Sequence, residues 1–235
     1  MNNILMKTYK LTTTILSLLL LAFISVKADT VVGKISDEYS VTSTGQFKYE
    51  MHIACVAGTG GVIPQLNVAY NSSNGIGLLG KGFDLIGISR ITRSPRNLFR
   101  DGKAVIVRFD SNDRFTLDGN RLTIVRTEGT RREYRTESNT FAKIISEGDL
   151  SNPARFMVYS RDGTIHEYRP ASALLGATAP DLYWLETKVS DTKGNYYTVS
   201  YGGNISENEI VPKRIEYTGN HNAGLSPYAY VCLTY

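Results

Sequence analysis

Alternation between apolar and polar residues is the main pattern of the chain after Gly33. Every second residue from Phe47 to Cys55 is large and apolar, and polar residues such as Lys48 stand between them. This period of two is that of a half-buried β-strand. The same alternation recurs over residues 66–70 and 105–109. The pattern predicts an all-β fold, a multi-stranded antiparallel sheet built of hairpins.

Asp-Gly pairs separate several of the predicted strands. The pair Asp162-Gly163 tolerates the positive φ values of a type I′ turn, whose twist matches the flanking strands. A two-residue turn there would pair Tyr159 with His166 in the hairpin over residues 155–169. It would also pair Met157 with Tyr168.

Two further turns are expected from the same chemistry. Asp118-Gly119 lies between Leu117 and Leu122 and predicts a second hairpin with a slightly longer loop. Gly194-Asn195 marks another turn. Helix signals are poor, and residues 171–179, bracketed by prolines, predict a loop with one helical turn.

The first 28 residues predict a cleavable signal peptide. Lys7 and Lys10 precede a mostly apolar run over residues 15–26, and cleavage is expected before Asp29. The alternative, an uncleaved anchor, is disfavoured because the run is shorter than the roughly 20 residues that a span needs. The predicted division is therefore a signal peptide over 1–28 and a β-rich module over 29–235.

Removing the signal peptide changes the charge balance. The 235-residue chain has a formal net charge of +4, from 26 basic and 22 acidic residues. Three of those lysines lie in the signal peptide, so the mature module is near +1 and bulk charge gives no support for nucleic-acid binding. An oxidising compartment would permit a disulfide between Cys55 and Cys232, but two buried free thiols are the favoured alternative.

A series of short motifs follows one order along the chain. They are Gly58-Thr59-Gly60-Gly61, Pro64-Gln65-Leu66, Tyr70-Asn71-Ser72, Gly77-Leu78-Leu79-Gly80-Lys81-Gly82-Phe83, Leu85, Gly87, Ile88, Ile91, Arg93, Asp113-Arg114-Phe115, Leu117-Asp118-Gly119-Asn120-Arg121-Leu122, Tyr134-Arg135-Thr136-Glu137, Asp162-Gly163, Glu167-Tyr168, Trp184-Leu185, Val189-Ser190-Asp191, Gly194-Asn195 and Ile215-Glu216-Tyr217-Thr218-Gly219-Asn220. In these motifs the chain resembles the N-terminal domain family of the Salmonella plasmid virulence protein SpvB. That domain is shared with the B subunit of insecticidal Tc toxin complexes and with RHS/YD-repeat proteins. The family's usual tryptophan is Phe83 here, and its usual proline pair is Val56-Ala57.

The resemblance implies a role in assembly. In Tc-type B subunits this domain is part of a β-shell, next to a β-propeller and RHS repeats, that encloses a toxic C-terminal region. In the Salmonella protein the actin-modifying ADP-ribosyltransferase is a separate C-terminal domain, which finds no counterpart in this chain. The chain stops at Tyr235 inside an expected strand, which suggests a truncated gene or a fragment.

Glycine-rich segments are expected to be structural turns. Residues 75–80 match G-x-G-x-x-G, but two further glycines follow where a dinucleotide site needs a helix, so a tight crossing between strands is favoured. Residues 58–61 lack the Lys-Ser/Thr of a P-loop and predict a turn. The expected structural turn residues are Gly58, Gly60, Gly61, Gly77, Gly80, Gly82, Asp118, Gly119, Asp162, Gly163, Gly194 and Asn195.

Catalytic and metal-binding patterns are weak. Glu207-Asn208-Glu209 is similar to the Glu-x-Glu of ADP-ribosyltransferases, but a polar surface loop is favoured. The three histidines share no ligand spacing, and no nucleophile motif is recognisable. No catalytic, cofactor or metal residue is therefore predicted.

The leading hypothesis is a non-enzymatic, secreted shell module of a toxin-complex or RHS-like virulence protein. Its expected partners are the following RHS or propeller domains or toxin-complex subunits. No contact with nucleic acid is expected. Contact with a membrane is expected only through the transient signal peptide. The second hypothesis is a secreted adhesion or glycan-binding β-domain, and a cryptic hydrolase or transferase is the third.

Overall fold

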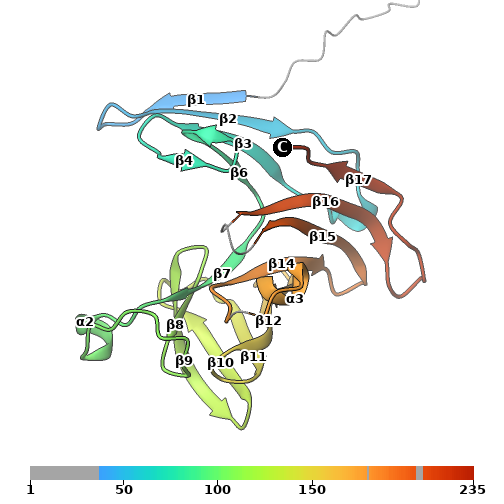
Figure 1. The fold of residues 1–235 in the computed structure, drawn as a ribbon. Helices are drawn as coiled ribbons and strands as arrows, with labels where there is room; N and C mark the ends of the chain where they lie inside the picture. Colours follow the sequence, from blue (N-terminus) through green and yellow to red (C-terminus); the bar gives the residue numbers. More distant parts are fainter. Residues whose placement is uncertain (1–36, 179, 205–208) are drawn as a thin grey trace, which may run out of the picture. The chain divides into compact units, whose positions relative to one another are not determined.

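The computed structural model describes residues 37–178, 180–204 and 209–235 (Figure 1). They lie within the compact unit Ser36–Tyr235. The predicted signal peptide lies outside the described residues, as do two residues of the Glu-x-Glu motif, Glu207 and Asn208. Strands dominate the described part, and every pairing between strands is antiparallel, so the predicted all-β class is confirmed.

The first part of the module is a four-stranded sheet with the order β1-β2-β3-β6. Its strands are β1 (Asp37–Val41), β2 (Phe47–Ile53), β3 (Leu66–Asn71) and β6 (Phe83–Ile86). A 3-10 turn, η1 (Thr59–Gly61), lies between β2 and β3. A two-stranded hairpin of β4 (Ile76–Gly77) and β5 (Gly80–Lys81) precedes β6.

The second part is a larger sheet with two short helices. Its strands are β7 (Arg90–Ser94), β8 (Arg114–Leu117), β9 (Asn120–Glu128), β10 (Arg131–Thr136), β11 (Lys143–Gly148), β12 (Pro153–Tyr159), β13 (Ile165–Pro170), β14 (Tyr183–Ser190), β15 (Asn195–Asn204), β16 (Glu209–Asn220) and β17 (Ala229–Cys232). The helices are α2 (Leu98–Asp101) and α3 (Ala171–Leu175). Gly176, with a φ of 71°, ends α3, so the predicted single helical turn is confirmed.

Strand β14 closes part of the larger sheet on itself. Along one side it pairs with β13 from Trp184 to Ser190. Along the other side its first residues pair with β7, and its last residues, Lys188 to Ser190, pair with β15. Strands β7 to β14 therefore form a closed ring without a free edge, and β15, β16 and β17 extend from it.

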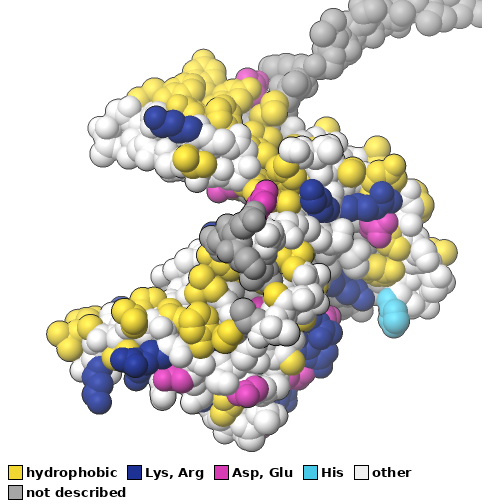
Figure 2. Space-filling model, viewed as in Figure 1, with side chains coloured by type: hydrophobic (Ala, Val, Ile, Leu, Met, Phe, Trp, Pro, Cys, Tyr) yellow, Lys and Arg dark blue, Asp and Glu magenta, His cyan; other side chains and the backbone are white. Residues whose placement is uncertain are grey.

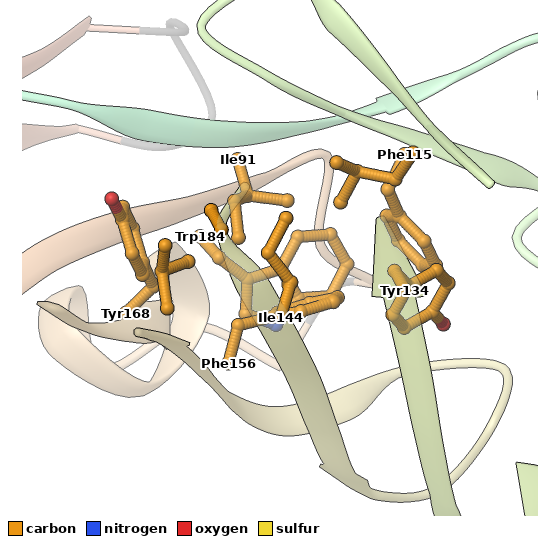
Figure 3. Packing of buried hydrophobic residues seen from close by; sticks show 10 residues of the cluster. Ile91, Phe115, Tyr134, Ile144, Phe156, Tyr168 and Trp184 are labelled. Carbon is orange, nitrogen blue, oxygen red and sulfur yellow. The ribbon is translucent and has the colours of Figure 1, made fainter. Parts of the chain in front are cut away.

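The interior of the ring is filled by one aromatic and aliphatic cluster (Figure 3). Each ring strand contributes to it. The buried members are Ile91, Phe115, Leu122, Tyr134, Ala142, Ile144, Phe156, Val158, Tyr168 and Trp184. The Trp184 ring meets Phe115 and Phe156 edge-on, with centroids 5.2 and 5.4 Å apart, and its Nε1 donates to the Pro153 carbonyl at 2.7 Å. A polar partner for the one indole N–H lets this tryptophan be fully buried.

A second cluster joins the four-stranded sheet to the extension. Leu66 of β3 is fully buried among residues of β14, β15 and β16, and Ile53 and Cys55 pack against the same cluster. The buried partners of Leu66 are Val189, Tyr197, Val199, Ile215 and Tyr217. Both cysteines are free. Cys55 is half-buried, but Cys232 is exposed on β17, so the expectation of two buried thiols is wrong for Cys232.

The β12–β13 hairpin differs from its prediction by one residue in register. Tyr159 pairs with Ile165, not with His166, and Met157 pairs with Glu167. The loop is longer than two residues: Ser160 N donates to the Thr164 carbonyl, so residues 161–163 lie between the bonded positions. The Asp162 carboxylate accepts from Thr164 N at 3.0 Å, and the positive φ of 88° lies at Gly163. An Asx turn has replaced the expected type I′ turn.

The two-residue turn occurs instead at Asp118-Gly119. Leu117 pairs with Asn120, and both turn residues have positive φ, 48° and 82°. The expectation of a longer loop here is wrong. The Asp118 carboxylate accepts from Ser89 Oγ at 2.5 Å and from Arg90 N at 2.9 Å, which compensates its left-handed backbone.

The strand expected over residues 105–109 does not form. Val105 makes a single bridge to Arg96, and Phe109 has a φ of 57°, outside the range of a strand. Among the described residues, no helix is long and apolar enough to cross a membrane.

Candidate interaction surface

The register of the four-stranded sheet gathers apolar side chains on one of its faces. Directly paired residues share a face, so the central row is Tyr39, Tyr49, Tyr70 and Phe83. The rows on either side continue the pattern. We call this surface the apolar face, formed by Tyr39, Val41, Phe47, Tyr49, Met51, Val68, Tyr70, Phe83 and Leu85.

Only one end of this sheet face is covered. Beyond the apolar face, Leu66 is fully buried against the second cluster. At the other end Tyr39 and Val41 are 76% and 68% exposed, and Phe47 and Phe83 are also exposed. Figure 2 shows hydrophobic side chains gathered in this part of the molecule. A contiguous exposed apolar surface on a soluble domain typically marks an interaction site.

Aromatic packing orders the apolar face. The ring centroids of Tyr70 and Phe83 are 4.7 Å apart, and those of Tyr70 and Phe47 are 6.2 Å apart. Gly82, just before Phe83, has a φ of 81°, and a Cβ there would lie 2.5 Å from the Tyr70 ring. The glycine therefore makes room for Tyr70.

Strand edges lie open on β1 and β17 in the described part of the chain, whereas the outer edge of β6 is engaged by Leu79 N, which donates to the Phe83 carbonyl. β1 pairs only with β2, and β17 only with β16. Each of these strands therefore has one side of its main chain without a strand partner. Such edges can accept a further strand through main-chain hydrogen bonds.

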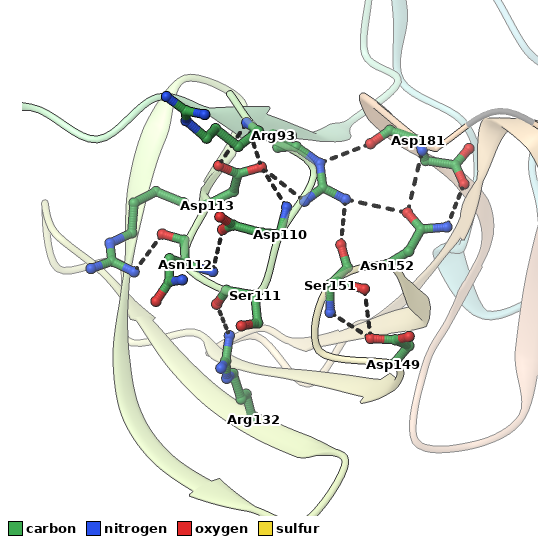
Figure 4. Close-up of polar contacts among 12 residues, drawn as sticks. Arg93, Asp110, Ser111, Asn112, Asp113, Arg132, Asp149, Ser151, Asn152 and Asp181 are labelled. Atoms are coloured by element: carbon green, nitrogen blue, oxygen red, sulfur yellow. Dashed lines mark hydrogen bonds and ion pairs between the residues drawn. The ribbon is translucent and has the colours of Figure 1, made fainter. Parts of the chain in front are cut away.

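Arg93 binds the loops at one end of the closed ring (Figure 4). It is only 2% exposed. Its Nε donates to the Asp181 carbonyl at 2.9 Å and its Nη2 to the Ser151 carbonyl at 2.7 Å, while Nη1 pairs with the Asp113 carboxylate at 3.3 Å. Burial lowers the pKa of Arg93, and Asp113 opposes that shift. Because its nitrogens are all engaged inside the protein, Arg93 holds the fold together and is not placed to bind a ligand.

A second buried polar group involves His166 of β13. Its Nδ1 lies 2.6 Å from Glu186 Oε1, and its Nε2 lies 3.1 Å from Thr164 Oγ1. Glu186 is 1% exposed, and burial raises the pKa of its carboxyl although His166 acts in the opposite direction. Thr164 Oγ1 donates to Asp162 Oδ1 at 2.7 Å, so its proton is not directed at the imidazole. The arrangement fixes the His166 ring between Glu186 and Thr164 and does not activate a nucleophile.

Other candidate chemistry is scattered. His52 contacts Asn67, and His221 follows β16, so the three histidines lie in different elements. No group of three or more potential metal ligands occurs within the described ranges. A shallow hollow on the outer face of β9 to β11 is lined by Arg126, Glu128, Arg131, Glu133, Lys143 and Ile145. Arg126, Glu128, Glu133 and Lys143 form ion pairs with one another, and Arg131 pairs with Glu147, as is typical of a solvated surface.

The glycine-rich segments occupy short turns. Gly77 and Gly80 pair with each other in the β4–β5 hairpin, and strand β6, not a helix, follows Gly82. Gly58 precedes η1, which contains Gly60 and Gly61. Asp118, Gly119, Asp162 and Gly163 lie in the hairpin turns already described.

The structure brings Gly60 and Asn195 together, although they are far apart in sequence. A Cβ on Gly60 would lie 2.3 Å from Asn195 Nδ2. Asn195 follows Gly194 at the start of β15, and Thr59 Oγ1 donates to the Thr218 carbonyl of β16 at 2.9 Å. These contacts attach η1 to the extension. The sequence predicted both turns but carried no signal of their contact.

The described fold and its motifs correspond to one family model. The model described as Salmonella virulence plasmid 65kDa B protein, SpvB, matches residues 41–179, which is more than half of the chain. The chain belongs to the SpvB family. Comparison with proteins of curated function gives no match.

Solved structures share the fold of this SpvB family member. A crystal structure of TcdB2-TccC3 has a TM-score of 0.64 and 18% identity, and the match covers 86% of this chain and 12% of that chain. The structure of a Photorhabdus luminescens Tc holotoxin pore has a TM-score of 0.61 and 18% identity, and the match covers 78% of this chain and 10% of that chain. The N-terminal domain of effector protein SpvB from Salmonella typhimurium strain LT2 has a TM-score of 0.55 and 17% identity. This match covers 72% of this chain and 62% of that chain.

The chain thus spans about 12% of the length of the Tc toxin chain it matches. These likenesses concern the N-terminal domain of SpvB and parts of Tc toxin components. They show a shared fold.

Proposed function

We propose that the chain is a non-catalytic module of a secreted toxin-complex or RHS-like virulence protein, and that it forms part of a β-shell enclosing or presenting a C-terminal effector. The observation that carries this proposal is the apolar face, which is covered at one end and exposed at the other. A shell segment needs such a face because its neighbours must complete its core. Membership of the SpvB family supports the same role.

Assembly would use both the face and the edges. Neighbouring strands would pair with the open edges of β1 or β17 and set the register of the joint. The apolar face would then bury Tyr39, Val41 and Phe83 against a partner surface, at roughly 25 cal/mol per Å² of apolar area. We further propose that residues 1–28 direct export and that the mature module begins at Asp29.

A comparison of two variants tests the role of the apolar face. We expect the purified chain to self-associate and to bind a hydrophobic dye, because its apolar face has no partner. The variant Tyr39→Thr/Val41→Thr should reduce both without lowering the melting temperature, because threonine suits a strand and both side chains are exposed.

The matched control is Ile76→Thr/Val125→Thr, which changes two exposed residues outside the apolar face. It should leave self-association and dye binding unchanged. A monodisperse, cooperatively melting monomer that binds no dye would overturn the proposal. Sequencing the gene beyond codon 235 tests the shell separately: an in-frame continuation with YD repeats supports it, and a stop with no neighbouring subunit gene contradicts it.

A glycan-binding domain is the second candidate, favoured by exposed tyrosines near the edge strand β17. Tyr228 and Tyr230 are 78% and 56% exposed, and Arg214 stacks on the Tyr230 ring at 3.7 Å. Binding of the isolated chain to a glycan array, lost in Tyr228→Ala, would favour this function over the shell.

A further inference from the structure

The segment around α2 exposes large apolar side chains away from the apolar face. Leu98, Phe99 and Ile106 are 69%, 87% and 76% exposed. Arg100 stacks on Phe99, with its guanidinium carbon 4.9 Å from the ring centroid. We call residues 95–108 the α2 tip. Figure 2 shows hydrophobic and basic side chains together at this place.

The α2 tip is held firmly at its base. The Asp101 carboxylate accepts from Arg114 Nε at 2.8 Å and from Arg121 Nη2 at 2.5 Å, and so attaches α2 to β8 and β9. Asn97 Oδ1 accepts from Arg100 N at 2.7 Å and caps the helix. The bridge between Arg96 and Val105 joins the two arms of the segment. The exposed apolar residues are therefore presented by a fixed loop.

The charge of the α2 tip is positive. It contains the four basic residues Arg96, Arg100, Lys103 and Arg108. Its single acid, Asp101, is neutralised by two arginines outside the segment. Arg100 also pairs with Glu137. Lys103 and Arg108 are exposed, so cationic groups accompany the apolar ones.

We propose that the α2 tip binds anionic lipid bilayers, with Leu98, Phe99 and Ile106 inserted among the headgroups and the basic residues paired with lipid phosphates and carboxylates. Apolar side chains bordered by Lys and Arg are the composition of interfacial membrane contacts. Of the basic residues, Lys103 is the one that separates a membrane contact from a protein contact, because protein interfaces are enriched in arginine but depleted of lysine. This contact is separate from the transient one expected of a signal peptide, and it does not depend on the shell role.

Flotation with vesicles tests the proposal on the purified chain. We expect co-flotation with vesicles of phosphatidylserine and phosphatidylcholine, and weaker binding to phosphatidylcholine alone. The variant Leu98→Ser/Phe99→Ser should lose most of the binding, because it removes the inserted side chains. Lys103→Glu should weaken it by about tenfold, and added salt should weaken the wild-type interaction.

Matched controls distinguish binding through the α2 tip from nonspecific binding through other exposed residues. Ile76→Ser/Tyr228→Ser removes two exposed apolar side chains elsewhere, and Lys81→Glu reverses an exposed charge on β5. Both should bind like the wild type, and all variants should keep the same melting temperature. Absence of binding to anionic vesicles, or equal loss in the control variants, would overturn the proposal. So would equal binding to both vesicle types.

Discussion

Gly60 lies where η1 touches β15, and two separate effects disfavour any other residue there. Its φ is 63°, and a Cβ would overlap the Asn195 amide at 2.3 Å. Gly61 has a similar φ of 82° but open space around it. We expect Gly60→Ala to lower the free energy of unfolding by about 3 kcal/mol and Gly61→Ala by about 1 kcal/mol. Equal losses in chemical denaturation would show that the Asn195 contact is unimportant.

Glu186 makes the stability depend on pH. Burial raises its pKa above the ordinary value of 4.5, with His166 opposing the shift. As the pH rises above 4.5, the unfolded chain releases this proton before the folded one does, so stability falls until the folded pKa is passed. We expect melting temperatures of the wild type to fall over this window relative to those of Glu186→Gln. Parallel curves would contradict this, and the exposed Glu128→Gln is the control.

At the scale of elements, alternation located two of three strands and did not locate turn geometry. The strands β2 and β3 lie where period two places them, but no strand forms over residues 105–109. The two Asp-Gly turns exchanged their expected types, and at Asp118 contacts distant in sequence decide the type. Ser89 and Arg90 hold Asp118 in its left-handed conformation, and no local pattern announces those partners.

The burial of Arg93 in the interior of the ring also could not be predicted from local sequence. A charged residue in β7 would be expected to face solvent, yet it is enclosed by Phe115 and Trp184, whose ring centroids lie 5.4 and 5.2 Å from its guanidinium carbon. Only the family resemblance marked this position. The loops it binds come together only when the ring is closed, so the sequence could not show its partners.

The Arg93 network predicts a non-additive pair of variants. Arg93→Met should cost about 3–5 kcal/mol of unfolding free energy, because it leaves Asp113 buried without its cation. Arg93→Met/Asp113→Asn should cost less than the sum of the single variants, because the uncompensated charge is gone. Denaturant titration of the four proteins measures the coupling. Strict additivity would mean that the ion pair contributes nothing to the closure.

At the scale of the whole module, the closed ring of β7 to β14 is the stable part, and the strands with open edges are the part available for pairing. Every strand from β7 to β14 has partners on both sides, whereas the edge strands β1 and β17 have one neighbour each in the described chain. Since opening of a ring strand breaks two ladders and exposes the Trp184 cluster, its amides should exchange only with global unfolding. Amides at the open edges can exchange without global unfolding.

Hydrogen–deuterium exchange should therefore divide the chain by topology. Amides of β8 to β13 are expected to exchange slowest and together, and those of β1 and β17 fastest among the strands. Phe115→Ala should accelerate the ring by costing about 3–5 kcal/mol, while Phe99→Ala, 87% exposed, should leave it unchanged. Protection of β1 equal to that of the ring would mean that its edge is already occupied, by a second copy of the chain. Exchange at the apolar face should then become faster on dilution, which would identify self-association there as the substitute for the missing shell partner.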